Sequence, residues 1–312
     1  MTGFPELANA GGVDGSRFAA VSQIPTYAAA LYVALLVTAG APAEHVDFTK
    51  AVHRLDQLSA TTALVLGLAI LLVALVLHPL QLPLVRLLEG YWPGHFGRTL
   101  AAVRVRQLER KRVGQPETLP DRKPDPETDQ AVLAKAWLDA QRYPPGNVPL
   151  LPTALGNALR AAEATAGAAY GAEAVTWWPR LYNVLAVDVR SVVDDRRLQL
   201  DVACRLTATA AAAGVATLPL LARSGWWLVV AIVPFALAWT AYQAAVAAAV
   251  AYGEAVRAAF DLHRFDLLKA LHVPLPANVD AERDLNRRLS RFWDQGVPLP
   301  LDFAYAHGKD EA

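Results

Sequence analysis

The chain has 312 residues, of which 54% are hydrophobic and 19% charged, and 29 lysines and arginines balance 29 aspartates and glutamates. A net charge of zero leaves no basic footprint for nucleic acid, so nucleic-acid binding is not expected. The single cysteine excludes an intrachain disulfide.

The apolar residues gather in long charge-free blocks, which favours a membrane protein over a soluble bundle with long buried helices. The blocks are residues 18–43, 57–85, 206–222 and 224–253, with 26, 29, 17 and 30 residues. A membrane-spanning helix needs about 20 residues. The third block reaches this length because Arg205 and Arg223 can extend their charged ends to the interface.

The predicted fold is all-α, with four transmembrane helices arranged as two hairpins that flank a helical cytoplasmic domain. The expected parts are an N-terminal tail (1–17), a hairpin (18–78), the helical domain (79–201), a second hairpin (202–253), and a C-terminal helix and tail (254–312). The segment 79–201 carries 16 basic residues and the region after residue 253 carries eight. Because basic loops stay in the cytoplasm, both termini and the central domain are expected there.

The first hairpin contains a proline near its start. Pro25 predicts that the helix begins near Thr26, with residues 18–24 along the membrane interface. Nothing in the first residues resembles a cleaved signal peptide, so the first helix is expected to persist. After the second helix, Tyr91 and Trp92 are expected to act as interfacial anchors.

A basic helix and a proline-rich linker come next. Residues 98–113 show a helical pattern, and the stretch 86–112 has seven basic and two acidic residues, which indicates attraction to a bilayer with anionic headgroups. Residues 114–129 contain four prolines and alternating charges and are predicted to be a flexible linker. Residues 130–142 resume a helix, and residues 143–152 are expected to be extended.

The next helix starts after Thr153, a suitable N-cap, and is expected to run to about residue 169, where Gly167 or Gly171 can end it. Three polar side chains follow one edge of it at spacings of three: Asn157, Arg160 and Glu163. They could present an amide, a guanidinium and a carboxylate to a polar ligand. The favoured alternative is a salt bridge between the two charged residues, with the asparagine capping a neighbouring segment.

The segment WWPRLY holds four further candidates for a ligand or partner face: Trp177, Trp178, Arg180 and Tyr182. They could form an aromatic cage or a cation–π site. A membrane boundary or an interdomain core is the more common origin of such a cluster. Because Pro179 interrupts this segment, a short strand or a membrane-surface stretch is expected.

The second hairpin is alanine-rich. Ser191 and Asp194 suggest a capping box for the helix that leads into it. Ser224 begins a tight turn between its two helices, and the second of these is expected to continue unbroken to residue 272. Residues 280–292 are predicted to form the last helix.

Small residues suggest close helix contacts in this hairpin. Pairs four apart occur at Ala210 and Gly214, and at Ala245 and Ala249, so each helix has a face of little bulk. These faces could meet within the hairpin or between copies. A homo-oligomer would bring Thr240 and Gln243 towards a central path.

No metal, cofactor or catalytic residue is expected. The seven histidines show no helical ligand spacing, one cysteine cannot build a thiolate site, and no phosphate-binding glycine loop or nucleophile elbow occurs.

The strings LPTALGNALRAAE, YG and WWPRLY, within residues 151–182, resemble a pattern of multi-pass membrane proteins of actinobacteria and related bacteria. The resemblance implies a bacterial plasma-membrane protein and no particular activity. The leading hypothesis is a self-associating membrane protein that forms or gates a pore under control of its cytoplasmic domain. The alternatives are a non-conducting scaffold for a cytoplasmic protein partner, and a lipid-acting enzyme using Asn157, Arg160 and Glu163.

Overall fold

The computed structural model describes residues 15–42, 81–113, 141–146 and 148–299, together with isolated positions between 47 and 72 and residues 139 and 305. Every regular element in these residues is a helix, which confirms the all-α prediction. The chain forms two compact units. We call residues 13–87 and 198–248 the apolar unit, and residues 1–12, 88–197 and 249–312 the helical domain.

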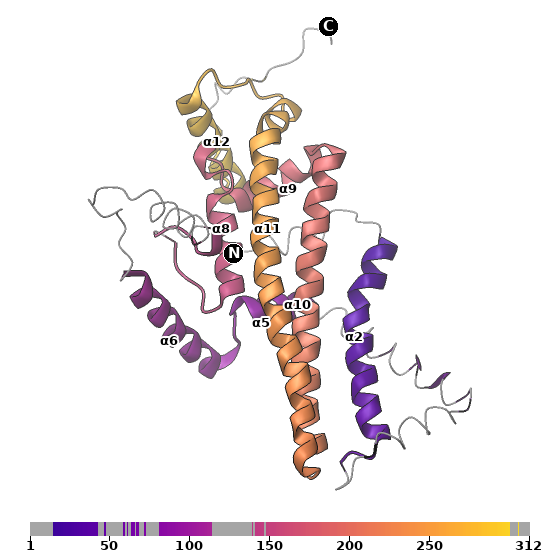
Figure 1. Cartoon of the computed structure of the whole chain (residues 1–312). Helices are drawn as coiled ribbons and strands as arrows, with labels where there is room; N and C mark the ends of the chain where they lie inside the picture. Colours follow the sequence, from indigo (N-terminus) through magenta and orange to yellow (C-terminus); the bar gives the residue numbers. More distant parts are fainter. Residues whose placement is uncertain are drawn as a thin grey trace, which may run out of the picture. The chain divides into compact units, whose positions relative to one another are not determined.

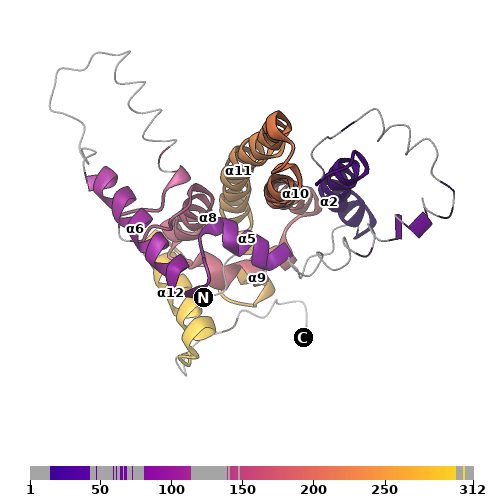
Figure 2. The same ribbon diagram turned by 90° about the horizontal axis from the view of Figure 1, so that it is seen from below.

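Three long helices contribute to the apolar unit (Figure 1): α2 (Gly15–Thr38), α10 (Val187–Leu221) and α11 (Ile232–Ala270). The short 3-10 helix η4 (Gly225–Ala231) follows the turn at Ser224 and leads into α11, as expected for a hairpin. In this unit α2 lies beside α10, and α10 beside α11 (Figure 2). A small core of Leu36, Ala39 and Leu221 joins the end of α2 to the end of α10.

Two helices are long and apolar enough to cross a membrane, Val187–Leu221 and the continuous stretch Gly225–Ala270. The apolar part of α2, Ile24–Thr38, is shorter than the roughly 20 residues that a span requires. Most of the second predicted span lies outside the described residues. Four transmembrane helices are therefore not confirmed.

The start of α2 differs from expectation. The helix begins at Gly15 and contains Pro25 in its interior, so the prediction of a start near Thr26 was wrong. A proline inside a helix removes one backbone hydrogen bond. Pro25 and Thr26 are both buried, and this packing offsets the lost bond.

The helical domain contains α6 (Gly94–Val113), α8 (Ala154–Thr165), the 3-10 helix η3 (Ala168–Tyr170), α9 (Ala174–Val184) and α12 (Val279–Gln295). It also includes the first residues of α10 and the last part of α11. The helices predicted over 98–113 and 280–292 are confirmed as α6 and α12. The last two residues of α5 (Gln81–Glu89) belong to it as well. The linker 114–129 lies outside the described residues.

The start of α8 is confirmed. Thr153 is its N-cap, and its side chain accepts a hydrogen bond from the Gly156 amide. The helix ends at Thr165, earlier than residue 169, and Gly167 and Gly171 then take left-handed conformations with φ of 71° and 73°. Glycine adopts these angles at no steric cost, so the two residues turn the chain from α8 into α9.

Two local predictions next to α9 were wrong. WWPRLY is helical, with Pro179 inside α9, where a strand or surface stretch was expected. The helix that follows begins at Val187, so Ser191 and Asp194 lie inside α10 and form no capping box. The Ser191 hydroxyl donates to the Asp188 carbonyl instead, and Asp194 accepts a hydrogen bond from Tyr182.

Candidate functional site

The polar edge predicted on α8 is in large part a structural device. Asn157 is completely buried. Its Oδ1 accepts from the Leu151 amide at 2.7 Å, and its Nδ2 donates to the carbonyls of Leu151 and Thr153 at 2.8 and 2.9 Å. The side chain therefore closes the loop before α8, as in the alternative that it caps a neighbouring segment, and both its Oδ1 and its Nδ2 bond to the chain's own backbone.

The other two residues of that edge are half-buried. Arg160 donates from Nη1 to the Pro149 carbonyl at 3.1 Å, and thus also holds the preceding loop. Glu163 is half-buried further along α8. The structure places Asn157, Arg160 and Glu163 on one helix, where the first two bond to the loop before α8.

The N-terminus of α8 also meets the end of α5 within the helical domain. The Thr153 hydroxyl donates to the Glu89 carbonyl at 2.6 Å. A Cβ at Gly156 would collide with that same carbonyl oxygen. Glycine is therefore required at this position by close backbone approach, although it costs helix stability relative to alanine.

The aromatic residues of α9 form the core of the helical domain. Trp177 and Trp178 are 0% and 1% exposed. Trp178 stacks on Phe260 of α11 with ring centroids 6.3 Å apart, and Trp177 meets Trp293 of α12 edge-on at 5.3 Å. Two buried tryptophans with such neighbours are core residues rather than an open cage.

Arg180 and Tyr182 border this core and are half-buried. The Arg180 guanidinium lies 4.3 Å from the centre of the Trp293 ring, and burial lowers its pKa. Burial, with a 2.7 Å hydrogen bond to Asp194, raises the pKa of Tyr182 to about 12. Both side chains carry internal contacts: the cation–π pair exists, but its ring belongs to the protein's own α12.

Sequence reasoning missed the contribution of α12. Ser290 accepts a hydrogen bond from the Trp177 indole at 2.9 Å, and Asn286 donates to the Tyr170 carbonyl at 2.8 Å. Glu282 forms a 2.7 Å ion pair with Arg264. These three α12 residues are buried, and their spacing of four is the helical signal that could have identified the buried face.

The small-residue face of α11 is covered within the chain. Ala241, Ala245 and Ala249 are 4%, 0% and 0% exposed. Further along, a Cβ at Gly253 would lie 2.7 Å from the Ala162 side chain of α8. This face is therefore buried, and at Gly253 the residue that covers it comes from α8, outside the hairpin.

The other predicted pore residues take two different places. Ala210 is buried, and a Cβ at Gly214 would lie 2.9 Å from the Phe235 ring, so this pair faces α11 within the hairpin. Thr240 and Gln243 are exposed on α11. The Thr240 hydroxyl donates to the Leu237 carbonyl at 3.0 Å.

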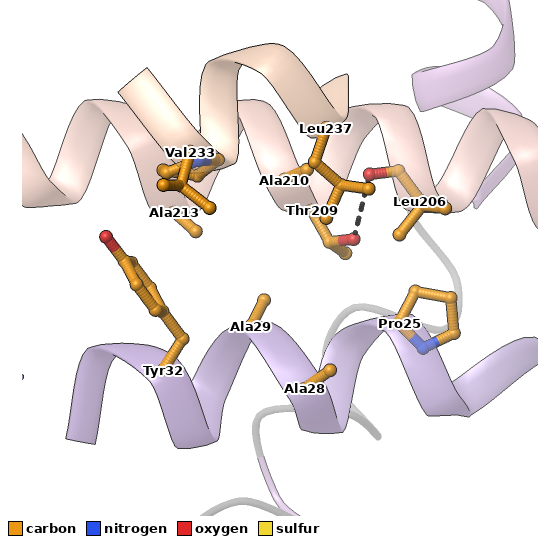
Figure 3. A pocket seen from close by; sticks show the side chains of 11 residues that line it. Pro25, Ala28, Ala29, Tyr32, Leu206, Thr209, Ala210, Ala213, Val233 and Leu237 are labelled. Carbon is orange, nitrogen blue, oxygen red and sulfur yellow. Dashed lines mark hydrogen bonds between the residues drawn. The ribbon is translucent and has the colours of Figure 1, made fainter. Parts of the chain in front are cut away.

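The apolar unit contains a pocket of about 130 Å³ between α2, α10 and α11 (Figure 3). Its lining is Pro25, Ala28, Ala29, Tyr32, Leu206, Thr209, Ala210, Ala213, Val233, Pro234 and Leu237. The Thr209 hydroxyl is used internally, 2.8 Å from the Arg205 carbonyl and 3.3 Å from that of Leu206. A pocket with this lining can hold an apolar group, and its Tyr32 hydroxyl also bonds within the chain, to the Val230 carbonyl at 3.5 Å and to Thr217 at 3.3 Å.

Among the described residues, no group of three His, Cys, Asp or Glu side chains is placed to hold a metal ion. Comparison with known proteins finds no matching family model, no matching curated sequence and no matching solved structure. A functional assignment therefore depends on the helices and on the side chains described above.

Proposed function

We propose that this protein is an integral membrane scaffold, in which the apolar unit anchors the helical domain at the cytoplasmic face of a bacterial plasma membrane. Large apolar side chains exposed on its hairpin support the anchoring. Val215, Trp226 and Trp239 are 60%, 76% and 65% exposed. Such exposed side chains on or beside helices long enough to span a bilayer are suited to lipid contact.

The observation that carries the scaffold proposal is the continuity of α11. This helix has 39 residues, or about 58 Å at 1.5 Å per residue, against a hydrocarbon core of about 30 Å. Residues up to 248 belong to the apolar unit and residues from 249 to the helical domain. One unbroken helix therefore serves as both anchor and core element, an arrangement suited to holding a domain at a membrane.

The internal use of the predicted ligand residues also favours a scaffold over an enzyme. Asn157 is buried and makes three hydrogen bonds to the chain's own backbone, and the tryptophans of α9 are core residues. A lipid-acting site built on Asn157, Arg160 and Glu163 would need the first of these to reach a substrate. For this reason we do not propose that activity.

Cysteine labelling tests the anchoring and the orientation. In a Cys204→Ala background, single cysteines are placed at position 48, between the first two predicted spans, and at the exposed α12 residue Asp284. An impermeant maleimide should label position 48 in intact cells and position 284 only after permeabilisation. Extraction of the protein by alkali, or labelling of position 284 in intact cells, would contradict the proposal.

Photo-crosslinking tests the scaffold role. A photoreactive amino acid at the exposed Leu262 or Phe292, which are 64% and 41% exposed, should yield one defined adduct with a cytoplasmic protein. The buried Val256 serves as the control position and should yield none. Adducts with lipid or with a second copy alone would contradict partner recruitment.

A second candidate function is a pore formed by self-association. The observation that favours it is the exposure of Thr240 and Gln243 on a candidate membrane span, because an amide in hydrocarbon needs a polar partner. Another copy could supply that partner. Purified protein in liposomes should then conduct ions, and Gln243→Leu should reduce the conductance. A monomer in nanodiscs without conductance would exclude the pore.

A further inference from the structure

The helix α6 has two apolar faces, and only one of them is covered. Ala101, Val105 and Leu108 are half-buried and recur at spacings of four and three. Phe96, Leu100 and Val103 recur at the same spacings elsewhere on the helix and are 78%, 46% and 48% exposed. Because residues three and four apart share a helical face, the second set forms a continuous exposed stripe.

Among the described side chains of α6, every charged residue beside this stripe is basic. With 3.6 residues per turn, Arg106 and Arg110 fall along one border of the stripe and Arg104 along the other. All three are exposed. The one acidic residue of α6, Glu109, falls on the far side of the helix. An apolar stripe between basic borders is complementary to a bilayer that carries anionic headgroups.

The position of α6 in the chain brings such a surface within reach. The helix starts at Gly94, and the charge-free block 57–85 ends nine residues earlier. Between them, Tyr91 is 52% exposed, and tyrosine is an interfacial residue of membrane proteins.

We propose that α6 lies flat on an anionic phospholipid bilayer, with Phe96, Leu100 and Val103 in the headgroup–acyl boundary and the bordering arginines on lipid phosphates. The proposal rests on the proposed membrane anchoring, which supplies the bilayer. It assigns α6 a second attachment point that is separate from the membrane spans.

Two other occupants are less compatible with the chemistry of this face. A second copy of α6 would bring the same arginines against one another. The segment 114–129 carries five acidic and two basic residues and could pair with the arginines. Its apolar side chains are few, however, and cannot cover a stripe that contains a phenylalanine.

Lipid contact can be measured on the full chain in nanodiscs that hold one copy. In the Cys204→Ala background, an environment-sensitive NBD fluorophore is attached at Leu100→Cys on the stripe, or at Ala102→Cys as the matched control. Ala102 is exposed on the opposite side of the same helix. Spin-labelled lipids should quench the fluorophore at position 100 and leave position 102 unaffected. Quenching should be stronger with 30% phosphatidylglycerol than with phosphatidylcholine alone.

Charge removal tests the electrostatic part of the proposal. The combined variant Arg104→Gln, Arg106→Gln and Arg110→Gln should lower the ratio of docked to undocked α6 roughly 100-fold, about fivefold per arginine. Glu109→Gln is the matched control and should not lower it. Equal quenching at positions 100 and 102 would overturn the proposal. Equal quenching at position 100 in nanodiscs with and without phosphatidylglycerol would overturn it as well.

The other occupants give distinct results. Blue-shifted emission at position 100 without lipid quenching in one-copy nanodiscs would mean that the chain itself covers the stripe. The same signal appearing only in nanodiscs with two copies would indicate self-association. Either result overturns the proposal for α6, while resistance of the protein to alkaline extraction would still report on the anchoring independently.

Discussion

Replacing Asn157 by alanine separates a structural role for this residue from a role in ligand binding. The substitution removes three hydrogen bonds to the loop before α8. The Thr153 carbonyl keeps a partner after the substitution, because it also accepts a hydrogen bond from the backbone N–H of residue 157 at 3.1 Å. The amide and carbonyl of Leu151 lose the partners that the asparagine side chain gave them.

The expected cost follows from these contacts. A net contribution of about 1 kcal/mol per hydrogen bond, with a penalty for backbone groups that stay unpaired, gives a loss of roughly 2–4 kcal/mol in local stability. Hydrogen exchange of the α8 amides, followed by mass spectrometry on the detergent-solubilised protein, measures local opening. Exchange should accelerate roughly 30- to 900-fold, since 1.36 kcal/mol corresponds to a factor of ten.

Arg160→Ala provides the comparison on the same helix. Arg160 is half-buried and makes one hydrogen bond to the loop, so its loss should accelerate exchange less than tenfold. If Asn157→Ala left α8 exchange within threefold of the original rate, the structural explanation would be refuted and a ligand role would again deserve testing.

Asn157→Asp adds a pH dependence. An introduced carboxylate can accept from the Leu151 amide, but its second oxygen faces two carbonyl oxygens. Burial and these acceptors raise the pKa of the carboxyl in the folded state above its unfolded value. The variant should therefore be least stable above that folded-state pKa and recover stability as the pH falls through it, because the protonated acid can donate. A deficit unchanged by pH would contradict this explanation.

Three further predictions concern the same domain. Gly156→Ala should destabilise α8 by about 3 kcal/mol, because the added Cβ would collide with the Glu89 carbonyl. Hydrogen exchange of the α8 amides at the rate of the unsubstituted protein would contradict this close approach. Trp177→Phe should cost about 1–2 kcal/mol through the lost bond to Ser290, measured by chemical unfolding, and an unchanged midpoint would argue against that bond. Tyr182 should resist ionisation in an ultraviolet titration up to about pH 12. Since the pKa of tyrosine in the unfolded chain is near 10, the contribution of Tyr182 to folding stability is complete below pH 10 and declines above it. Ionisation of Tyr182 near pH 10 would contradict its burial.

The parts of the fold that the sequence predicted correctly depend on local signals. Thr153 caps α8 as its type and position indicate, and α12 lies where its pattern places it. The long helix α11 (Ile232–Ala270) was also predictable, because no proline interrupts the pattern after Pro234 in its first turn. Such signals act within a few residues, and they therefore survive without knowledge of tertiary contacts.

The wrong predictions concern places where tertiary packing outweighs a local preference. Pro179 costs α9 a backbone hydrogen bond, yet the helix persists because Trp177, Trp178 and Leu181 are all buried by it. The polar edge on α8 could be interpreted as a ligand face, beside the favoured alternative in which Asn157 caps a neighbouring segment, for a related reason. Nothing near Asn157 in the sequence shows that Leu151 folds back onto it.

The core around Trp177 is closed by residues that are far apart in the chain. Ser290 and Trp293 come more than a hundred positions later, after both candidate membrane spans. During synthesis, a ribosome delivers α8 and α9 first and α12 last. The indole of Trp177 therefore lacks its α12 partners until both spans have been translated, and contacts of such long sequence separation form late. Under the proposed membrane anchoring, insertion of the two candidate spans should precede closure of the helical domain, and a chain truncated before α12 should expose its tryptophans to chaperones and proteases.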